Sequence, residues 1–271
     1  MAGCSSAKAA LCAAFLFLLA GCAGIDRFGG SRQAVEDWGA ERGFATGRVD
    51  VEGFRLLTLK RGRGEVLDVY IEGDGAAWPS PYHPPRDPTP LAPTALALAN
   101  ADQAAVAYLG RPCQYLDEQQ LRACSADYWT TRRFAPEVIA AYMKALDLLK
   151  ERSGARRLRL VGYSGGGVIA VLLAGRRADV AHLVTVAAPV ALEEWVAWHK
   201  VTPLTGSLDP MAEKQPLPPA THFSGADDTV VPPVIAERFV AARGGKRRVV
   251  PDFDHQCCWA RDWARLLEET R

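Results

Sequence analysis

The sequence carries little net charge and no long run of residues of one charge. Its 271 residues include 32 lysines and arginines and 31 aspartates and glutamates, a formal net charge of +1. A protein that binds nucleic acid through the phosphates presents a basic surface, so the sequence does not predict that partner. The cysteines and histidines do not follow the spacing of a metal site, and we expect neither a metal ion nor another cofactor. There is no internal repeat, and the sequence makes no prediction of the oligomeric state.

The composition is that of a globular protein. Hydrophobic residues make up 49% of the chain and charged residues 23%. Such a chain can bury a sizeable core, and a single domain is the simplest expectation at this length.

An apolar run near the N-terminus, from Ala9 to Ala20, follows Lys8 and ends in Leu19-Ala20-Gly21-Cys22. The run is shorter than the roughly 20 residues that a membrane-spanning helix needs, and it fits the apolar part of a secretory signal peptide. Its last four residues resemble the lipobox of bacterial lipoproteins, which implies cleavage before Cys22 and lipid on this cysteine. An ordinary signal peptide cut at nearby small residues is the alternative. Both interpretations predict that the mature protein leaves the cytoplasm.

These features divide the chain into three parts. We expect a signal peptide over 1–21, a tether and lead-in segment over 22–45, and one main domain over 46–271. Acyl chains on Cys22 would anchor the protein to a membrane of the cell envelope, where it would face the periplasm. Two or more chains are needed for stable anchoring.

Four cysteines lie beyond the expected lipidation site, namely Cys113, Cys124, Cys257 and Cys258. An even number in an oxidising compartment predicts disulfides, and four cysteines allow three pairings. Cys113 with Cys124 is the simplest pair because it closes a short loop. That pairing leaves Cys257 and Cys258 either bonded to each other or free, and crossed pairs between the two regions are the alternative.

The segment from Leu158 to Ala174 predicts a strand, a sharp turn and a helix, with Gly162-Tyr163-Ser164-Gly165-Gly166 at the turn. A serine held in a strained turn at the end of a strand projects its Oγ clear of the sheet. The turn needs small neighbours, because a side chain at either outer glycine would crowd it. The helix that follows directs its first amides toward negative charge beside the serine.

This Gly-x-Ser-x-Gly between strand and helix resembles the nucleophile elbow of the α/β-hydrolases. A glycine-rich turn in a non-catalytic α/β domain is the alternative. Strands alternate with helices along the chain, which predicts a mostly parallel sheet with helices on both faces, as that fold has. We expect a hairpin within 44–60, strands over 65–71, 104–109, 180–187, 220–223 and 247–250, and another before Ser164. We expect the long loop 110–134 to form a wall of the substrate pocket, and 190–219 to be an irregular, small cap.

The resemblance implies a catalytic triad in the chain order serine, acid, histidine, with each partner just past a strand. Ser164 is then the nucleophile, and His255 is the base because it follows the last predicted strand and every strong acid candidate. Asp227 and Asp228 compete for the role of the acid. The run Gly225-Ala226-Asp227-Asp228-Thr229-Val230-Val231-Pro232 is similar to the family pattern Gly-x-x-Asp-x-x-Val-Pro, which favours Asp228.

The resemblance also implies an oxyanion hole. In this family the loop after the strand that ends near residue 71 often reads His-Gly, and here Glu72-Gly73 stands in its place. The backbone N–H groups of Asp74 and Gly165 are then the expected donors. A plain Gly-Asp-Gly turn over 73–75 is the alternative, and the glutamate departs from the usual histidine.

Taken together, these patterns predict a lipid-anchored, extracytoplasmic serine hydrolase with an α/β-hydrolase fold. It would cleave an ester-like acyl bond of a small-molecule or acyl substrate through an acyl-enzyme. A peptidase or a thioesterase on the same triad is one alternative. A non-catalytic, envelope binding lipoprotein is another, because a fold does not by itself establish a function.

Overall fold

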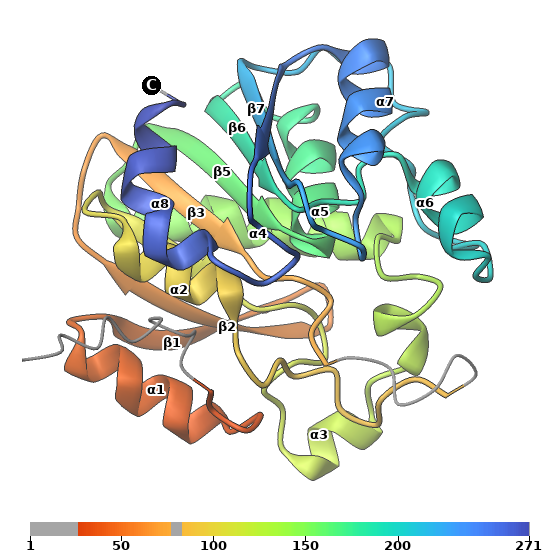
Figure 1. Cartoon of the computed structure of the whole chain (residues 1–271). Helices are drawn as coiled ribbons and strands as arrows, with labels where there is room; N and C mark the ends of the chain where they lie inside the picture. The colour runs from red at the N-terminus through yellow and green to blue at the C-terminus, as the bar shows by residue number, and fades with distance from the viewer. Residues whose placement is uncertain (1–26, 77–82, 271) are drawn as a thin grey trace, which may run out of the picture.

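The computed structural model describes residues 27–76 and 83–270, so the expected signal peptide and Cys22 lie outside the described residues. The described chain is built around an eight-stranded sheet in the order β1-β2-β4-β3-β5-β6-β7-β8 (Figure 1). The strands are β1 (Ala45–Val51), β2 (Phe54–Arg61), β3 (Val66–Ile71), β4 (Val106–Leu109), β5 (Arg157–Tyr163), β6 (Val180–Val186), β7 (Ala220–Gly225) and β8 (Lys246–Val250). Strands β1 and β2 form an antiparallel hairpin, and β2 pairs antiparallel with β4. The remaining neighbours pair in parallel.

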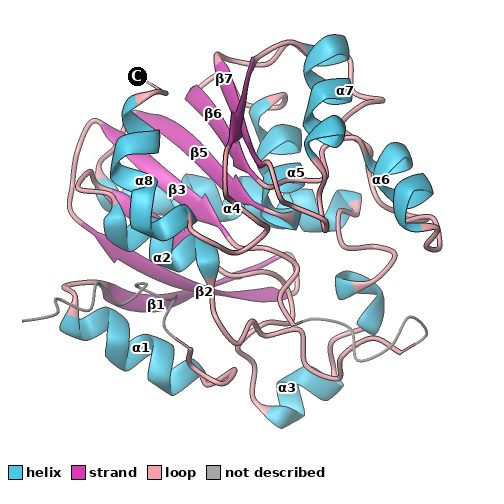
Figure 2. Ribbon diagram, in the orientation of Figure 1, coloured by secondary structure: helices cyan, strands magenta, loops and turns pink. Residues whose placement is uncertain are grey.

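Helices cover both faces of this sheet (Figure 2). They are α1 (Arg32–Glu41), α2 (Thr94–Ala101), α3 (Glu118–Arg122), α4 (Pro136–Ser153), α5 (Gly165–Ala174), α6 (Leu192–His199), α7 (Pro233–Arg243) and α8 (Trp259–Glu268). Helices α4 and α5 pack on one face, and α2 and α8 pack on the other. The expectation of a mostly parallel sheet between helices is therefore confirmed.

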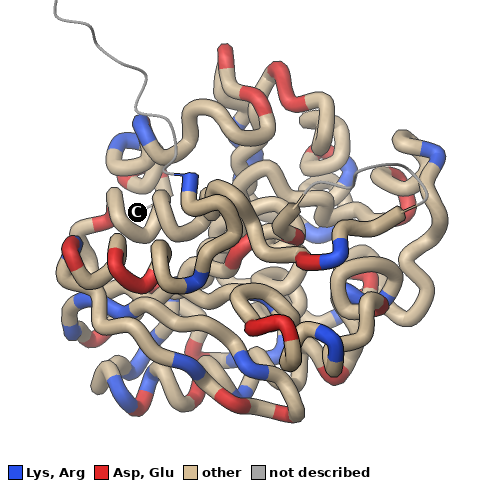
Figure 3. The backbone as a smooth tube through the Cα atoms, turned by 90° about the horizontal axis from the view of Figure 1, so that it is seen from below, with Lys and Arg blue, Asp and Glu red and all other residues tan. Residues whose placement is uncertain are grey.

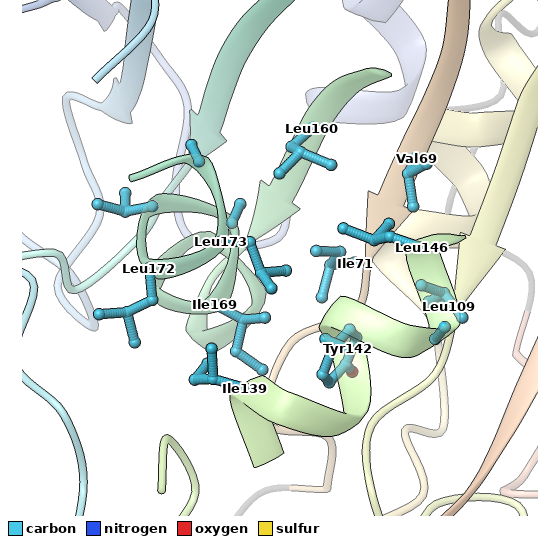
Figure 4. Packing of buried hydrophobic residues seen from close by; sticks show 14 of the residues in the cluster. Val69, Ile71, Leu109, Ile139, Tyr142, Leu146, Leu160, Ile169, Leu172 and Leu173 are labelled. Atoms are coloured by element: carbon cyan, nitrogen blue, oxygen red, sulfur yellow. The ribbon is translucent and has the colours of Figure 1, made fainter. Parts of the chain in front are cut away.

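The alternation of side chains along β3 shows how the core forms. Leu67, Val69 and Ile71 belong to the cluster on the side of α4 and α5, whereas Tyr70 points to the side of α2 and α8. Figure 4 shows Val69 and Ile71 packed against residues from α4 and α5. All ten residues of α5 are buried, which explains why this helix is apolar on every side.

Helix α4 has clear signals at both ends. It begins at Pro136, whose missing N–H is not needed in the first turn, and it ends at Ser153, before Gly154, which caps the helix with a φ of 73°. Charged positions of both signs are interspersed along the described backbone (Figure 3), in keeping with the small net charge.

Regular structure also occurs in the lead-in segment and in two segments that the sequence indicated to be loops. Helix α1 lies within the expected lead-in segment and packs on the sheet through Val35, which is fully buried. The loop 110–134 contains α3 and a short 3-10 helix over Ala126–Trp129. The segment 190–219 was expected to be irregular but contains α6, whose Leu192 is buried.

No helix among the described residues has the length and apolar character needed to cross a bilayer.

The parallel pairing determines where the site lies. The carboxyl ends of β3, β5, β6, β7 and β8 meet at one edge of the sheet. The loops that follow these strands therefore converge, and such an edge is where ligands bind in open α/β sheets.

Candidate active site

Ser164 occupies a strained turn between β5 and α5. Its φ of 49° and ψ of −126° lie outside the regions that L-residues favour. The flanking glycines make this turn possible, because a Cβ atom at Gly162 would lie 2.3 Å from the carbonyl oxygen of Gly166. A Cβ atom at Gly166 would lie 2.2 Å from the carbonyl oxygen of Ile71. The turn that the sequence predicted is therefore present, and it can be built only with glycine at both positions.

Ser164 lies at one end of a chain of hydrogen bonds with His255 and Asp228. Nε2 of His255 is 3.1 Å from Oγ of Ser164, and Nδ1 of His255 is 2.9 Å from Oδ2 of Asp228. The side chain of Asp228 is fully buried and that of His255 is 16% exposed. The structure thus brings together the serine, acid and histidine that the sequence selected, whereas the neighbouring Asp227 is exposed.

The second carboxylate oxygen of Asp228 is held by the backbone. Oδ1 accepts hydrogen bonds from the N–H groups of Val230, at 2.9 Å, and Val231, at 2.7 Å. These bonds leave Oδ2 directed at Nδ1 of His255, which selects the tautomer with its acceptor nitrogen toward Ser164.

The loop that carries His255 is anchored by two aromatic side chains that the sequence analysis did not identify. The hydroxyl of Tyr163 donates to the carbonyl oxygen of His255 at 3.0 Å. Nε1 of Trp259 donates to the same oxygen at 3.1 Å and to that of Asp254 at 3.1 Å. Tyr163 lies inside the Gly-x-Ser-x-Gly motif, but nothing in the sequence links its hydroxyl to a loop about ninety residues away.

Two backbone amides next to Ser164 fit the predicted oxyanion hole. A Cβ atom at Gly73 would lie 3.2 Å from Cβ of Ser164, so the loop after β3 passes directly beside the serine. Within the described ranges, the N–H groups of Asp74 and Gly165 donate no hydrogen bond to the protein. Buried backbone donors are normally paired, so two unpaired amides at this place are available for a developing negative charge.

Glu72, which stands where the family often has histidine, connects this loop to helix α2. Its side chain is buried, and Oε1 accepts from the N–H groups of Gly73, at 2.9 Å, and Ala95, at 3.3 Å. The residue before the helix, Pro93, provides no side-chain cap, so Glu72 supplies the acceptor that the first turn of α2 needs. Burial raises the pKa of Glu72 to about 7, against the effect of the two N–H groups, which favour the charged form.

The cysteines beyond Cys22 form two disulfides in the structure. Cys113 is bonded to Cys124, with their Cα atoms 5.9 Å apart, and Cys257 is bonded to Cys258. The first bridge lies in the loop 110–134, which contacts the loop after β3 because Nε2 of Gln114 donates to the carbonyl oxygen of Gly73 at 3.1 Å. The second follows His255 and precedes α8.

Three further histidines, and the tryptophans of the segments 110–134 and 190–219, make no hydrogen bond to the side chains of Ser164, His255 or Asp228 in the part of the chain that the structure describes. The ring nitrogens of His182, His199 and His222 approach Oγ1 of Thr221, the carbonyl oxygen of Val230 and Oγ1 of Thr185 respectively. Nε1 of Trp195 donates to the same carbonyl oxygen of Val230, the residue whose N–H holds Asp228, and Nε1 of Trp129 donates to that of Pro85. Trp198 is 58% exposed.

The sequence matches no protein-family model and no curated protein, whereas many solved structures share its fold. An α/β serine hydrolase homologue from Coxiella burnetii is 16% identical, with a TM-score of 0.55 over 83% of this chain and 95% of that chain. An esterase from Pyrococcus furiosus is 13% identical, with a TM-score of 0.61 over 85% and 92%. A proline iminopeptidase-related protein from Thermus thermophilus is 15% identical, with a TM-score of 0.55 over 84% and 96%. The chain has the α/β-hydrolase fold that the sequence predicted.

Proposed function

We propose that this protein is a serine hydrolase that cleaves an ester-like acyl bond. The observation that carries the proposal is the chain of hydrogen bonds from Ser164 through His255 to Asp228. The unpaired N–H groups of Asp74 and Gly165 beside this serine support it. A nucleophile, a base that is oriented by a buried acid, and two oxyanion donors are the parts that acyl transfer needs.

In the proposed cycle, Oγ of Ser164 attacks the carbonyl carbon while Nε2 of His255 takes the hydroxyl proton. The carbonyl oxygen becomes an oxyanion that accepts from the N–H groups of Asp74 and Gly165. His255 then gives its proton to the leaving alcohol oxygen as the ester bond breaks, which leaves an acyl-enzyme. Water attacks the acyl-enzyme, His255 accepts a proton from it, and this proton returns to Ser164 as the acid product departs.

A peptide or thioester bond is the alternative for the same residues. The Pyrococcus protein is an esterase and the Thermus protein is proline iminopeptidase-related, so proteins with this fold are associated with both classes of bond. We favour an ester over a peptide because an alkoxide is a better leaving group than an amide anion, so an ester makes the smaller demand on His255 as a general acid.

A fluorophosphonate probe tests the proposal, because it reacts with an activated serine whatever the natural substrate is. We expect the purified mature protein to be labelled, and Ser164→Ala, His255→Ala and the heat-denatured wild type to remain unlabelled. p-Nitrophenyl esters, thioesters and aminoacyl p-nitroanilides should then separate the bond classes. A folded wild type that takes no label would contradict the proposal and favour a binding lipoprotein.

We also propose that the mature protein is anchored in the cell envelope through lipid on Cys22, on the strength of Leu19-Ala20-Gly21-Cys22. In a bacterial host, the wild type should fractionate with membranes and incorporate radiolabelled palmitate. Cys22→Ser should incorporate none, because the cysteine thiol is the acylated group. Equal palmitate incorporation in both proteins would rule out Cys22 as the anchor.

A further inference from the structure

The carboxylate of Asp74 lies against the proposed oxyanion hole and is held by two arginines. Its Oδ1 accepts from Nη1 of Arg111 at 2.9 Å, and its Oδ2 accepts from Nη1 of Arg133 at 2.6 Å. A Cβ atom at Gly165 would lie 2.0 Å from Oδ1, so this oxygen is in contact with the residue that supplies one oxyanion donor. The chain therefore places a carboxylate where negative charge is expected to develop during the reaction.

Further hydrogen bonds hold both guanidinium groups in place. Nη2 of Arg111 donates to the carbonyl oxygen of Arg133 at 2.8 Å, and Nε of Arg133 donates to that of Thr130 at 2.6 Å. Arg111 is 3% exposed and Arg133 is 9% exposed. Burial by itself would raise the pKa of Asp74, but Arg133 and Arg111 outweigh it and hold this pKa below its usual value. The cluster of Asp74, Arg111 and Arg133 is thus charged throughout.

The charges in this cluster do not cancel. Two cations surround one anion, and no other carboxylate in the described ranges forms an ion pair with either arginine. The nearest other acid along this loop, Glu72, directs Oε1 at Gly73 and Ala95 instead. An uncompensated buried charge destabilises a folded protein, so a purely structural role would be served better by one arginine than by two.

We propose that Arg111 and Arg133 are positioning residues of the oxyanion hole, which neutralise Asp74 and leave one positive charge to meet the oxyanion. The inference rests on the proposed function of Ser164. Without the arginines, the Asp74 carboxylate would repel the developing oxyanion, because like charges at short distance and partly shielded from water repel each other. When both arginines are present, one of their two positive charges is not neutralised by Asp74. The oxyanion of the tetrahedral intermediate then supplies the negative charge that pairs with it.

Arg133→Gln tests this arrangement, because it leaves Arg111 to hold Asp74 and removes the excess charge. We expect kcat for a neutral p-nitrophenyl ester to fall roughly tenfold with KM unchanged, as for an interaction made only in the transition state. The double variant Asp74→Asn/Arg133→Gln removes the carboxylate as well. It should recover kcat to within about threefold of the wild type, because Arg111 then supplies the excess charge. A role in folding alone predicts that the double variant is at least as impaired as the single one.

Arg132→Gln is the matched control, because this neighbouring arginine is 46% exposed and pairs with Glu137. It should keep the wild-type kcat and labelling rate, and thermal unfolding of every variant verifies that it is folded. If the wild type takes no fluorophosphonate label, the proposed function fails and the inference fails with it. If the wild type is labelled but Arg133→Gln reacts at the wild-type rate, the inference alone is overturned. A folded double variant that stays as slow as Arg133→Gln also overturns it.

Discussion

Replacing Asp228 by asparagine is expected to lower kcat by roughly 10⁴-fold, the size of loss seen when the acid of another serine hydrolase is changed in this way. Asparagine retains an oxygen for the N–H groups of Val230 and Val231, so the loop should keep its shape. Its amide nitrogen would face Nδ1 of His255 and select the tautomer that presents N–H, rather than a lone pair, to Ser164. Steady-state kinetics on the best ester substrate measure the loss.

Asp227→Asn provides the control at the adjacent position. Asp227 is exposed and its side chain is not part of the hydrogen-bonded chain, so kcat should stay within about twofold of the wild type. Equal losses in the two variants would mean that the effect comes from the loop as a whole and would contradict the assignment of Asp228 as the acid. Thermal unfolding of both variants separates a loss of chemistry from a loss of fold.

Replacing Gly162 by alanine is expected to destabilise the protein by roughly 3 kcal/mol or more. The new Cβ atom would lie 2.3 Å from the carbonyl oxygen of Gly166 and 2.4 Å from Cα of Gly167. Both contacts are with the backbone of the elbow, which cannot move aside without displacing Ser164. Urea unfolding measures the change in the free energy of unfolding, and labelling should be lost along with the fold.

Gly175→Ala is the matched control at the other end of α5. Its φ is −69°, and a Cβ atom there would meet no atom closer than 3.6 Å, the Cβ of Gln215. We expect its free energy of unfolding to equal that of the wild type or to exceed it by about 0.4–1 kcal/mol, because alanine restricts the unfolded chain. If Gly162→Ala were as stable as Gly175→Ala, the inference that the elbow has no room for a Cβ atom at Gly162 would be contradicted.

Local sequence patterns predicted most of the elements. The hairpin expected within 44–60 is formed by β1 and β2, and the strands expected over 65–71 and 180–187 are β3 and β6. The elbow was recognisable because its backbone conformation can be built only with glycine at Gly162 and Gly166. Helix α6 was missed because it is short and stands in a segment with several prolines.

The site residues were predicted from their spacing and from their positions relative to the predicted strands. The spacing of the run 225–232 selected Asp228, and the position of His255 after the last strand selected the base. The structure brings these residues to Ser164 because parallel strands end at one edge of the sheet. The pairing of Cys113 with Cys124 was only one of three options in the sequence.

The sequence by itself determined the features that depend on one residue and its neighbours. These are the succession of strand, turn and helix, the glycine-dependent elbow, and the chain order of the proposed serine, acid and histidine. Only the tertiary structure decided which distant groups meet, since a buried charge or donor takes its partner from whichever segment packs beside it. The contact of Asp74 with Arg111 and Arg133 and the bond from Tyr163 to the backbone of His255 are of this kind. Glu72 illustrates both cases, because its departure from histidine is visible in the sequence, whereas its role at helix α2 follows from packing.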